Sequence, residues 1–210
     1  MRSKSWLYRS VFVLILLHAV GLIGMLSPWR DLFFSLTPIH LVLASAVMLL
    51  NHGDWKRGHI AFLVTCFVVG FFAEVAGVHT GLIFGDYAYG TVLGPKLFAV
   101  PLVIGVNWLM LVYGMGMVVV KVKAHWIVRG ILAATLMVLL DVLIEPVAIA
   151  SGFWSWVGGV PPFMNYVGWF VVAAILQLYF YQLKAVSYNA VAVWLMAIQA
   201  AFFGLLNLFG

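Results

Sequence analysis

Three carboxylates stand inside long apolar stretches of this chain, where acidic residues are rare. Glu74 lies in one apolar run, and Asp141 and Glu145 lie in another. An ionised carboxylate at membrane depth is costly unless it is paired or hydrated, so such residues usually face the interior of a helix bundle and are candidates for function. No lysine or arginine lies in these runs at matching depth. We therefore expect at least one of the three to keep a proton that it can donate near neutral pH.

Asp141 and Glu145 are four residues apart, so they share one face of a helix. Pro146 follows them and lacks the backbone N–H that would bond to the carbonyl of Val142, which predicts a kink or a helix end. Irregular backbone at membrane depth is tolerated only inside protein or beside water. An ordinary helix terminus at the interface explains Pro146 equally well.

A loop of polar and aromatic residues follows the run that contains Glu74. The end of that run carries His79 and Thr80, and the loop 84–90 carries Asp86. Aromatic faces stabilise cations, and protonation of an alkene makes a cation. The aromatic residues that could serve this purpose, and that also fit an ordinary interfacial belt, are Tyr87, Tyr89, Trp154, Trp156 and Trp169.

The composition is that of a polytopic membrane protein. Of the 210 residues, 66% are hydrophobic and 8% are charged, against about 45–50% and about 25% in soluble proteins. A hydrocarbon core of about 30 Å needs about 20 apolar residues for one helical crossing. We predict an all-α fold, with residues 1–210 forming a single integral-membrane domain. The seven predicted spans are 6–26, 32–50, 59–78, 97–120, 127–149, 163–183 and 189–209.

Basic residues set the predicted orientation. Nine of the 11 lysines and arginines flank one set of span ends, and Arg30 and Lys96 flank the other. The positive-inside rule then places the N-terminus in the cytoplasm and the C-terminus outside. The N-terminal apolar run is interpreted as the first membrane helix, because no small-residue cleavage site follows it. The net charge of +5 is explained by these anchors and does not indicate nucleic-acid binding.

Polar residues from four predicted helices fall at a similar depth in this orientation. The third and fifth spans run outward, which puts the three carboxylates in the outer half of the membrane. The second and fourth spans run inward and bring His40, Asn107 and Trp108 to the same half. We expect these groups to form one site that opens toward Asp86 and the aromatic loop 153–156.

Several classes of function lack support in the sequence. The last span has no lysine for a retinal Schiff base, and there is no phosphate loop, His-Glu-x-x-His run, Gly-x-Ser-x-Gly elbow or Rossmann fingerprint. His18, His40 and His79 are not at metal-binding spacing, and structural hydrogen bonds are the favoured interpretation. Cys66 is interpreted as a packing residue. We expect no metal and no cofactor, which leaves acid chemistry on an apolar molecule.

Several sequence fragments together resemble one family of membrane proteins. The fragments are Glu74-x-x-Gly77-x-x-Thr80-Gly81-x-x-Phe84-Gly85-x-Tyr87-x-Tyr89, Leu93-Gly94, Val100-Pro101, Asn107-Trp108, Asp141-x-x-x-Glu145-Pro146, Trp154-x-Trp156 and Asn165-x-x-Gly168-Trp169. In combination they resemble the membrane carotenoid-biosynthesis family that includes the CruF-type carotenoid 1,2-hydratases and the bisanhydrobacterioruberin hydratases. The resemblance covers about residues 71–169.

The resemblance implies cofactor-independent addition of water across the terminal double bond of an acyclic carotenoid end group. A carboxylic acid would protonate the alkene, and carboxylate and aromatic faces would hold the tertiary cation until water captures it. Glu74 and Asp141 are the hypothesised acid/base pair, with Glu145 and Asp86 as secondary candidates. The residues hypothesised to bind or position the substrate are His79, Thr80, Tyr87, Tyr89, Asn107, Trp108, Trp154, Trp156, Asn165 and Trp169.

Two other functions remain open at this point. A carotenoid end-group cyclase makes the same kind of cation, which a neighbouring alkene captures instead of water. A proton-coupled transporter or lipid-binding protein would also use buried acids, although we see no inverted repeat and no matching pair of broken helices. The expected partners are an apolar carotenoid or isoprenoid substrate in the bilayer, membrane lipids and other carotenoid-biosynthesis enzymes. The expected location is the cytoplasmic membrane of a bacterium or archaeon.

Overall fold

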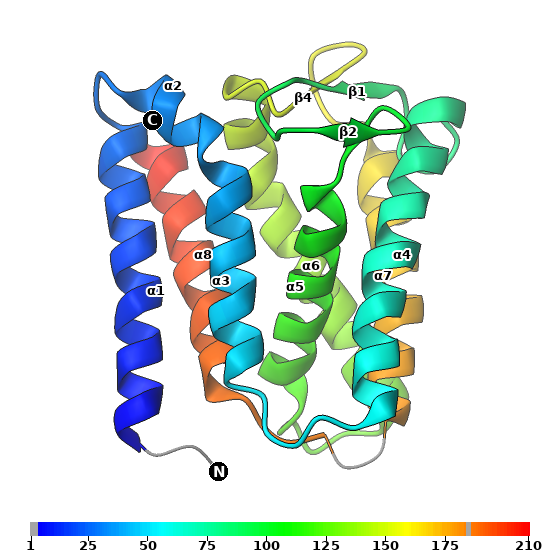
Figure 1. Ribbon diagram of the computed structural model, residues 1–210. Coiled ribbons are helices and arrows are strands. Elements are labelled where there is room, and N and C mark those ends of the chain that lie inside the picture. Colours follow the sequence, from blue (N-terminus) through cyan, green and yellow to red (C-terminus); the bar gives the residue numbers. More distant parts are fainter. Residues whose placement is uncertain (1–3, 184–185) are drawn as a thin grey trace.

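The protein is a bundle of helices that run side by side, with short strands at one end (Figure 1). A computed structural model describes residues 4–183 and 186–210. The helices in these ranges are α1 (Lys4–Met25), α2 (Arg30–Ser35), α3 (Thr37–Leu50), α4 (Arg57–Thr80), α5 (Val103–Val119), α6 (Trp126–Ala150), α7 (Phe163–Gln182) and α8 (Ala190–Phe209). The strands are β1 (Tyr87–Tyr89), β2 (Lys96–Leu97), β3 (Val100–Pro101) and β4 (Trp154–Trp156).

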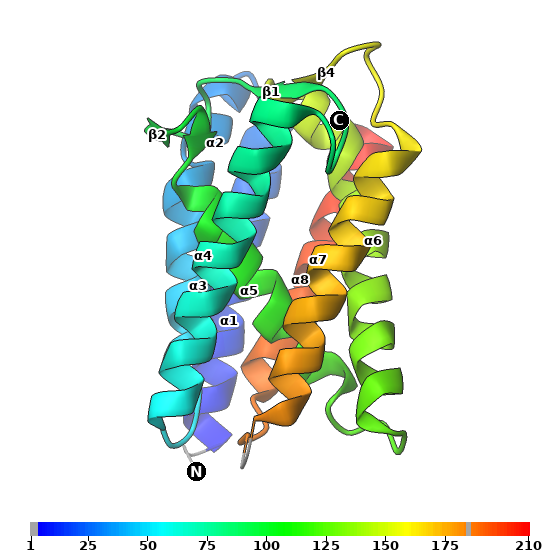
Figure 2. The same cartoon turned by 90° about the vertical axis from the view of Figure 1, so that its right-hand side faces the viewer.

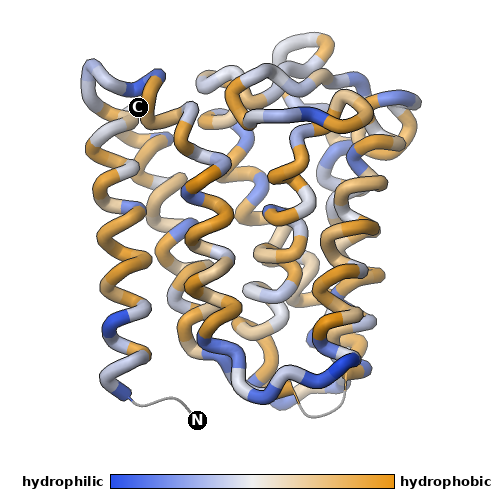
Figure 3. Tube along the Cα trace, in the orientation of Figure 1, coloured by the Kyte–Doolittle hydropathy of each residue, from blue (hydrophilic) through white to orange (hydrophobic). Residues whose placement is uncertain are grey.

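Five of the helices in the described ranges, α1, α4, α6, α7 and α8, are long and apolar enough to cross a membrane. Helices α3 and α5 are apolar but shorter, at 14 and 17 residues. Helix α1 begins and helix α8 ends at opposite ends of the bundle (Figures 1 and 2). Hydrophilic positions gather mainly at these two ends, as in the loop between α3 and α4 (Figure 3). The all-α membrane class is confirmed, whereas seven spans and their orientation stay predictions.

Two of the predicted spans differ from the helices observed. The span 32–50 is divided at Leu36 into the short helix α2 and the helix α3. The span 97–120 begins too early, because β2 and β3 form a hairpin ahead of α5. Phe98 and Ala99 make the two-residue turn of this hairpin with φ of 51° and 66°, as the twist of a tight hairpin turn requires. Pro101 is therefore in a strand and not in the helix.

Helix α6 does not end at Pro146. It continues to Ala150 with the proline inside it. A proline removes one hydrogen bond from the ladder, and neighbouring helices can satisfy backbone groups in that turn. Here the side-chain amide of Asn207 on α8 donates to the carbonyl of Leu143 at 2.7 Å. The carboxylates of α6 thus project from one continuous helix.

A two-stranded ribbon, which we call the aromatic lid, covers the end of the bundle where α8 ends (Figure 2). Strand β1 pairs antiparallel with β4, so that Tyr87 lies opposite Trp156 and Tyr89 lies opposite Trp154. Alternate residues of a strand face the same side, and Tyr87, Tyr89 and Trp156 are buried. The lid joins the loop after α4 to the loop after α6.

Phe84 fills the space beside the lid, between α4 and α7. Its ring lies where a Cβ would stand at Gly77 of α4, and it also meets Gly168 of α7. The carbonyl of Ile83 leaves no room for a Cβ at Gly168 either. Helix α4 ends at Gly81, whose φ of 66° is the left-handed conformation that glycine adopts without strain. These glycines allow the chain to fold back closely from α4 toward the lid.

Candidate active site

The three carboxylates meet around a small cavity beneath the aromatic lid. The cavity offers about 20 Å³ of room for the centre of a water molecule. Helices α4, α5, α6 and α7 form its walls. The residues that line it are Glu74, Tyr87, Tyr89, Ile104, Asn107, Asp141, Glu145, Trp154, Trp156, Asn165 and Trp169.

Glu74 is 2% exposed and accepts three hydrogen bonds from neutral donors. The hydroxyl groups of Tyr87 and Tyr89 donate to its Oε2 at 2.5 and 2.8 Å. The indole N–H of Trp108 donates to its Oε1 at 3.0 Å. Trp108 is held in place because its side chain occupies the space left by Gly70 on α4 and stacks on Trp169 at a centroid distance of 4.4 Å. Both oxygens of Glu74 are therefore fixed by a rigid surround.

Glu145 is bound in the same manner from the other strand of the lid. The indole N–H groups of Trp154 and Trp156 donate to its Oε2 at 3.0 and 2.9 Å. The amide of Asn165 on α7 donates to its Oε1 at 3.2 Å. Each strand of the lid thus holds one glutamate, and both glutamates accept hydrogen bonds at both oxygens.

Asp141 differs from the two glutamates. It is 1% exposed, and the amide of Asn165 donates to its Oδ2 at 3.1 Å. Its Oδ1 is buried and has no hydrogen-bond partner among the described residues. The predicted common face of Asp141 and Glu145 is confirmed, because one amide, that of Asn165, serves both.

The tyrosines of the lid are stable donors. Burial raises the pKa of Tyr87 and of Tyr89 well above the ordinary value, and the neighbouring carboxylate of Glu74 raises both further. Both phenols therefore keep their protons at physiological pH. Lys96 of β2 donates to the main-chain carbonyl of Tyr89 at 2.5 Å and not to a carboxylate.

Some residues expected at the site lie outside the cavity. Asp86 is exposed, and its carboxylate lies against Gly81. Thr80 and His79 are also exposed: the Thr80 hydroxyl donates to the carbonyl of Ala76 at 2.6 Å, and the His79 ring lies 3.2 Å from the carbonyl of Phe98.

His40 also lies away from the carboxylates, although it was expected to converge with them. Its ring contacts His18, with 3.3 Å between the two Nε2 atoms. Ile104, in contrast, lines the cavity without having been predicted. Its spacing of three residues from Asn107 places both on one face of α5 and could have indicated it.

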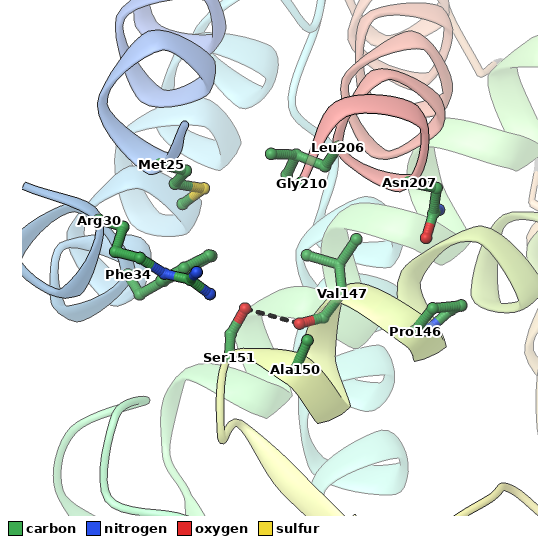
Figure 4. A pocket seen from close by; sticks show the side chains of 10 residues that line it. All are labelled: Met25, Arg30, Phe34, Pro146, Val147, Ala150, Ser151, Leu206, Asn207 and Gly210. Atoms are coloured by element: carbon green, nitrogen blue, oxygen red, sulfur yellow. Dashed lines mark hydrogen bonds between the residues drawn. The ribbon is translucent and has the colours of Figure 1, made fainter. Parts of the chain in front are cut away.

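A second pocket lies on the other side of α6 and has a volume of about 250 Å³ (Figure 4). It is bounded by α1, α2, α6 and α8, and its polar residues are Arg30, Ser151 and Asn207. The Ser151 hydroxyl is engaged, because it donates to the carbonyl of Val147 at 2.6 Å. No aspartate or glutamate side chain lines this pocket. The three buried carboxylates, Glu74, Asp141 and Glu145, instead line the cavity beneath the lid.

Two comparisons with known proteins gave matches. The family described as "carotenoid biosynthesis protein" matches residues 33–209. A curated relative, the bisanhydrobacterioruberin hydratase of Haloarcula japonica, is 32% identical over 136 residues. That match covers 60% of this chain and 45% of the relative, so the similarity spans less than half of the relative's length. No solved structure matches the chain.

Proposed function

This chain belongs to the carotenoid biosynthesis protein family, and from that premise we propose that it is a hydratase. The reaction would add water across the terminal double bond of an acyclic carotenoid end group. The name of the Haloarcula japonica relative supports hydration. The observation that carries the proposal is the contrast between two glutamates that accept three hydrogen bonds each and an aspartate with an unpartnered oxygen.

Asp141 is the acid in this proposal. Hydrogen bonds to a carboxylate favour its ionised form, and Glu74 and Glu145 accept such bonds at both oxygens. Asp141 accepts one hydrogen bond, at Oδ2, so Oδ1 can carry a proton without displacing any donor. That proton passes to the less substituted carbon of the double bond. A C–H bond forms from the π electrons, and a tertiary cation remains on the neighbouring carbon.

The surround of the cavity suits that cation. Glu74 and Glu145 supply negative charge that is fixed in position, and preorganised charge is worth more in a site that excludes water. The ring of Trp169 lines the same cavity and offers an aromatic face. Water then adds to the cation and returns a proton to Asp141, which closes the cycle. Asp141 thus serves as acid and base, and Glu74 serves as a counter-charge.

Pigment analysis in cells tests the proposal. The protein is expressed in a host that accumulates an acyclic carotenoid, and the pigments are resolved by chromatography and mass spectrometry. We expect a product heavier by one water, which Asp141→Asn abolishes. Asp86→Asn is the matched control, because it neutralises a carboxylate of the same type outside the cavity, and it should leave the product unchanged.

Two results would contradict the proposal in different ways. An isomeric product that contains a ring would identify a cyclase instead of a hydratase. Full hydration by Asp141→Asn would leave the reaction in place but remove Asp141 as the acid.

A further inference from the structure

The size of the cavity limits what it can hold. Its room of about 20 Å³ for the centre of a water molecule exceeds the roughly 10–15 Å³ that one water needs. A branched alkene end group contains several carbon atoms and fits in this space only when the lid moves away from the position observed. With the lid in this position, the cavity is matched to the smaller of the two reactants of a hydration.

Two polar groups at the cavity have no hydrogen-bond partner among the described residues. The Oδ1 atom of Asp141 is buried and accepts no hydrogen bond from any described residue. The carboxamide of Asn107 lines the same cavity, and no hydrogen bond joins it to another side chain or backbone group within residues 4–183 and 186–210. The neighbouring donors are already used, because Trp108 donates its hydrogen bond to Glu74 and Asn165 donates to both acids of α6. A buried water typically makes two to four hydrogen bonds to such otherwise unsatisfied groups.

We propose that the cavity binds one water molecule between Oδ1 of Asp141 and the carboxamide of Asn107, and that Asn107 positions this water to capture the cation. The assignment rests on the proposed hydratase function and deepens it. Asn107 acts on the water and not on the alkene, so it is a positioning residue. Its carboxamide can donate to and accept from a water, which fixes the direction of the oxygen lone pair.

The held water decides the fate of the cation. When Asp141 has given its proton to the alkene, the water oxygen forms the new C–O bond and one water proton returns to the Asp141 carboxylate. Without a held water, the cation can only return a proton from carbon to the same carboxylate. That reversal regenerates the alkene or moves its double bond, and no alcohol forms. Loss of the Asn107 carboxamide should therefore reduce the formation of alcohol, whereas the exchange of protons between the alkene and the solvent should continue.

Turnover in heavy water separates these two outcomes. Membranes that contain the full chain are incubated in D₂O with an acyclic carotenoid, and mass spectrometry measures both the alcohol and the deuterium in recovered alkene. For Asn107→Leu we expect alcohol formation to fall on the order of tenfold to a hundredfold, as misplacement of a reactant does. Deuterium should still enter the recovered alkene. Asn107→Ser, which keeps a hydrogen-bonding group, should restore part of the alcohol.

Asp86→Asn is the matched control, because it alters a polar side chain that lies outside the cavity. It should leave the ratio of alcohol to exchange unchanged. The assignment of the water is overturned if Asn107→Leu keeps the wild-type ratio of alcohol to deuterium exchange. It is also overturned if both Asn107 variants lose alcohol and exchange in parallel. In either case the hydratase function stands. If the wild-type chain makes no alcohol but exchanges deuterium, the hydratase function itself fails, and the water assignment fails with it.

Discussion

Asn165 offers a direct test of how the two acids of α6 are organised. Its amide group has two hydrogens, and it donates to Oδ2 of Asp141 at 3.1 Å and to Oε1 of Glu145 at 3.2 Å. Asn165→Leu keeps a similar size and removes both donors. Asp141 then loses its one hydrogen bond to the described residues, and Glu145 keeps the two donors of the lid.

The expected loss of stability follows from these two hydrogen bonds. Side-chain hydrogen bonds between membrane helices contribute on average about 0.6 kcal/mol each, and at most about 1.7 kcal/mol. Removing two of them should lower the free energy of unfolding by about 1–3 kcal/mol. The effect on hydration should be larger, on the order of a hundredfold in rate, because the orientation of the proposed acid depends on the same amide.

The assay compares Asn165→Leu with Gln177→Met in detergent and in pigment-producing cells. Gln177 is another buried amide on α7, and it donates to the carbonyl of Val112 at 2.8 Å and to the sulfur of Met137 at 3.6 Å. Gln177→Met therefore also removes an interhelical hydrogen bond, but away from the carboxylates. Unfolding is followed by denaturant titration, and alcohol formation is normalised to the amount of folded protein.

The two variants should separate stability from chemistry. Gln177→Met should lose about 1 kcal/mol of stability and keep its hydration per folded molecule, whereas Asn165→Leu should lose both. Wild-type hydration by folded Asn165→Leu would refute the reasoning, because it would mean that the shared amide does not orient the acid.

Three further predictions concern the fold around the site. Gly168→Ala should lower the free energy of unfolding by about 1–3 kcal/mol, because the added Cβ meets a backbone carbonyl. Gly204→Ala is the control: its added Cβ meets nothing within 4 Å, so it should be neutral or slightly stabilising. Denaturant titration compares the two variants. Cysteines at Ala88 and Ser155, which lie opposite each other on the two strands of the lid, should form a disulfide that stops hydration until a reductant is added, because the cavity in its observed form has too little room for an end group. Activity that persists under oxidation would show that the strands need not separate. A reporter enzyme that works only outside the cytoplasm should be active when it is fused after Gly210. The predicted orientation would be reversed if this fusion is inactive and a reporter that works only in the cytoplasm is active at the same position.

The sequence indicated the membrane class and the acids because these depend on local composition. Long apolar runs and the four-residue spacing of Asp141 and Glu145 are visible without any tertiary contact. The exclusion of Asp86 from the cavity was also accessible, since alternation along a strand places Tyr87 and Tyr89 on one side and Asp86 on the other. Its closeness in sequence to the aromatic residues was misleading because successive side chains along a strand point to opposite faces.

Long-range pairing could not be read from the sequence. Nothing local indicates that residues 87–89 pair with 154–156, because antiparallel pairing across such a distance is decided by the packing of α4, α6 and α7 around it. The hairpin ahead of α5 was hidden for another reason. Its turn residues, Phe98 and Ala99, adopt positive φ without the glycine or asparagine that usually marks such a turn.

The pairing of the two strands gives the aromatic lid its part in the chemistry. Strand β1 supplies two donors to Glu74, and strand β4 supplies two donors to Glu145. A lid that moves away to admit an end group therefore withdraws donors from both glutamates, which disfavours their ionised forms. Movement of the lid would thus couple admission of the substrate to the charge state of both glutamates, because the same four side chains line the cavity and hold the two glutamates.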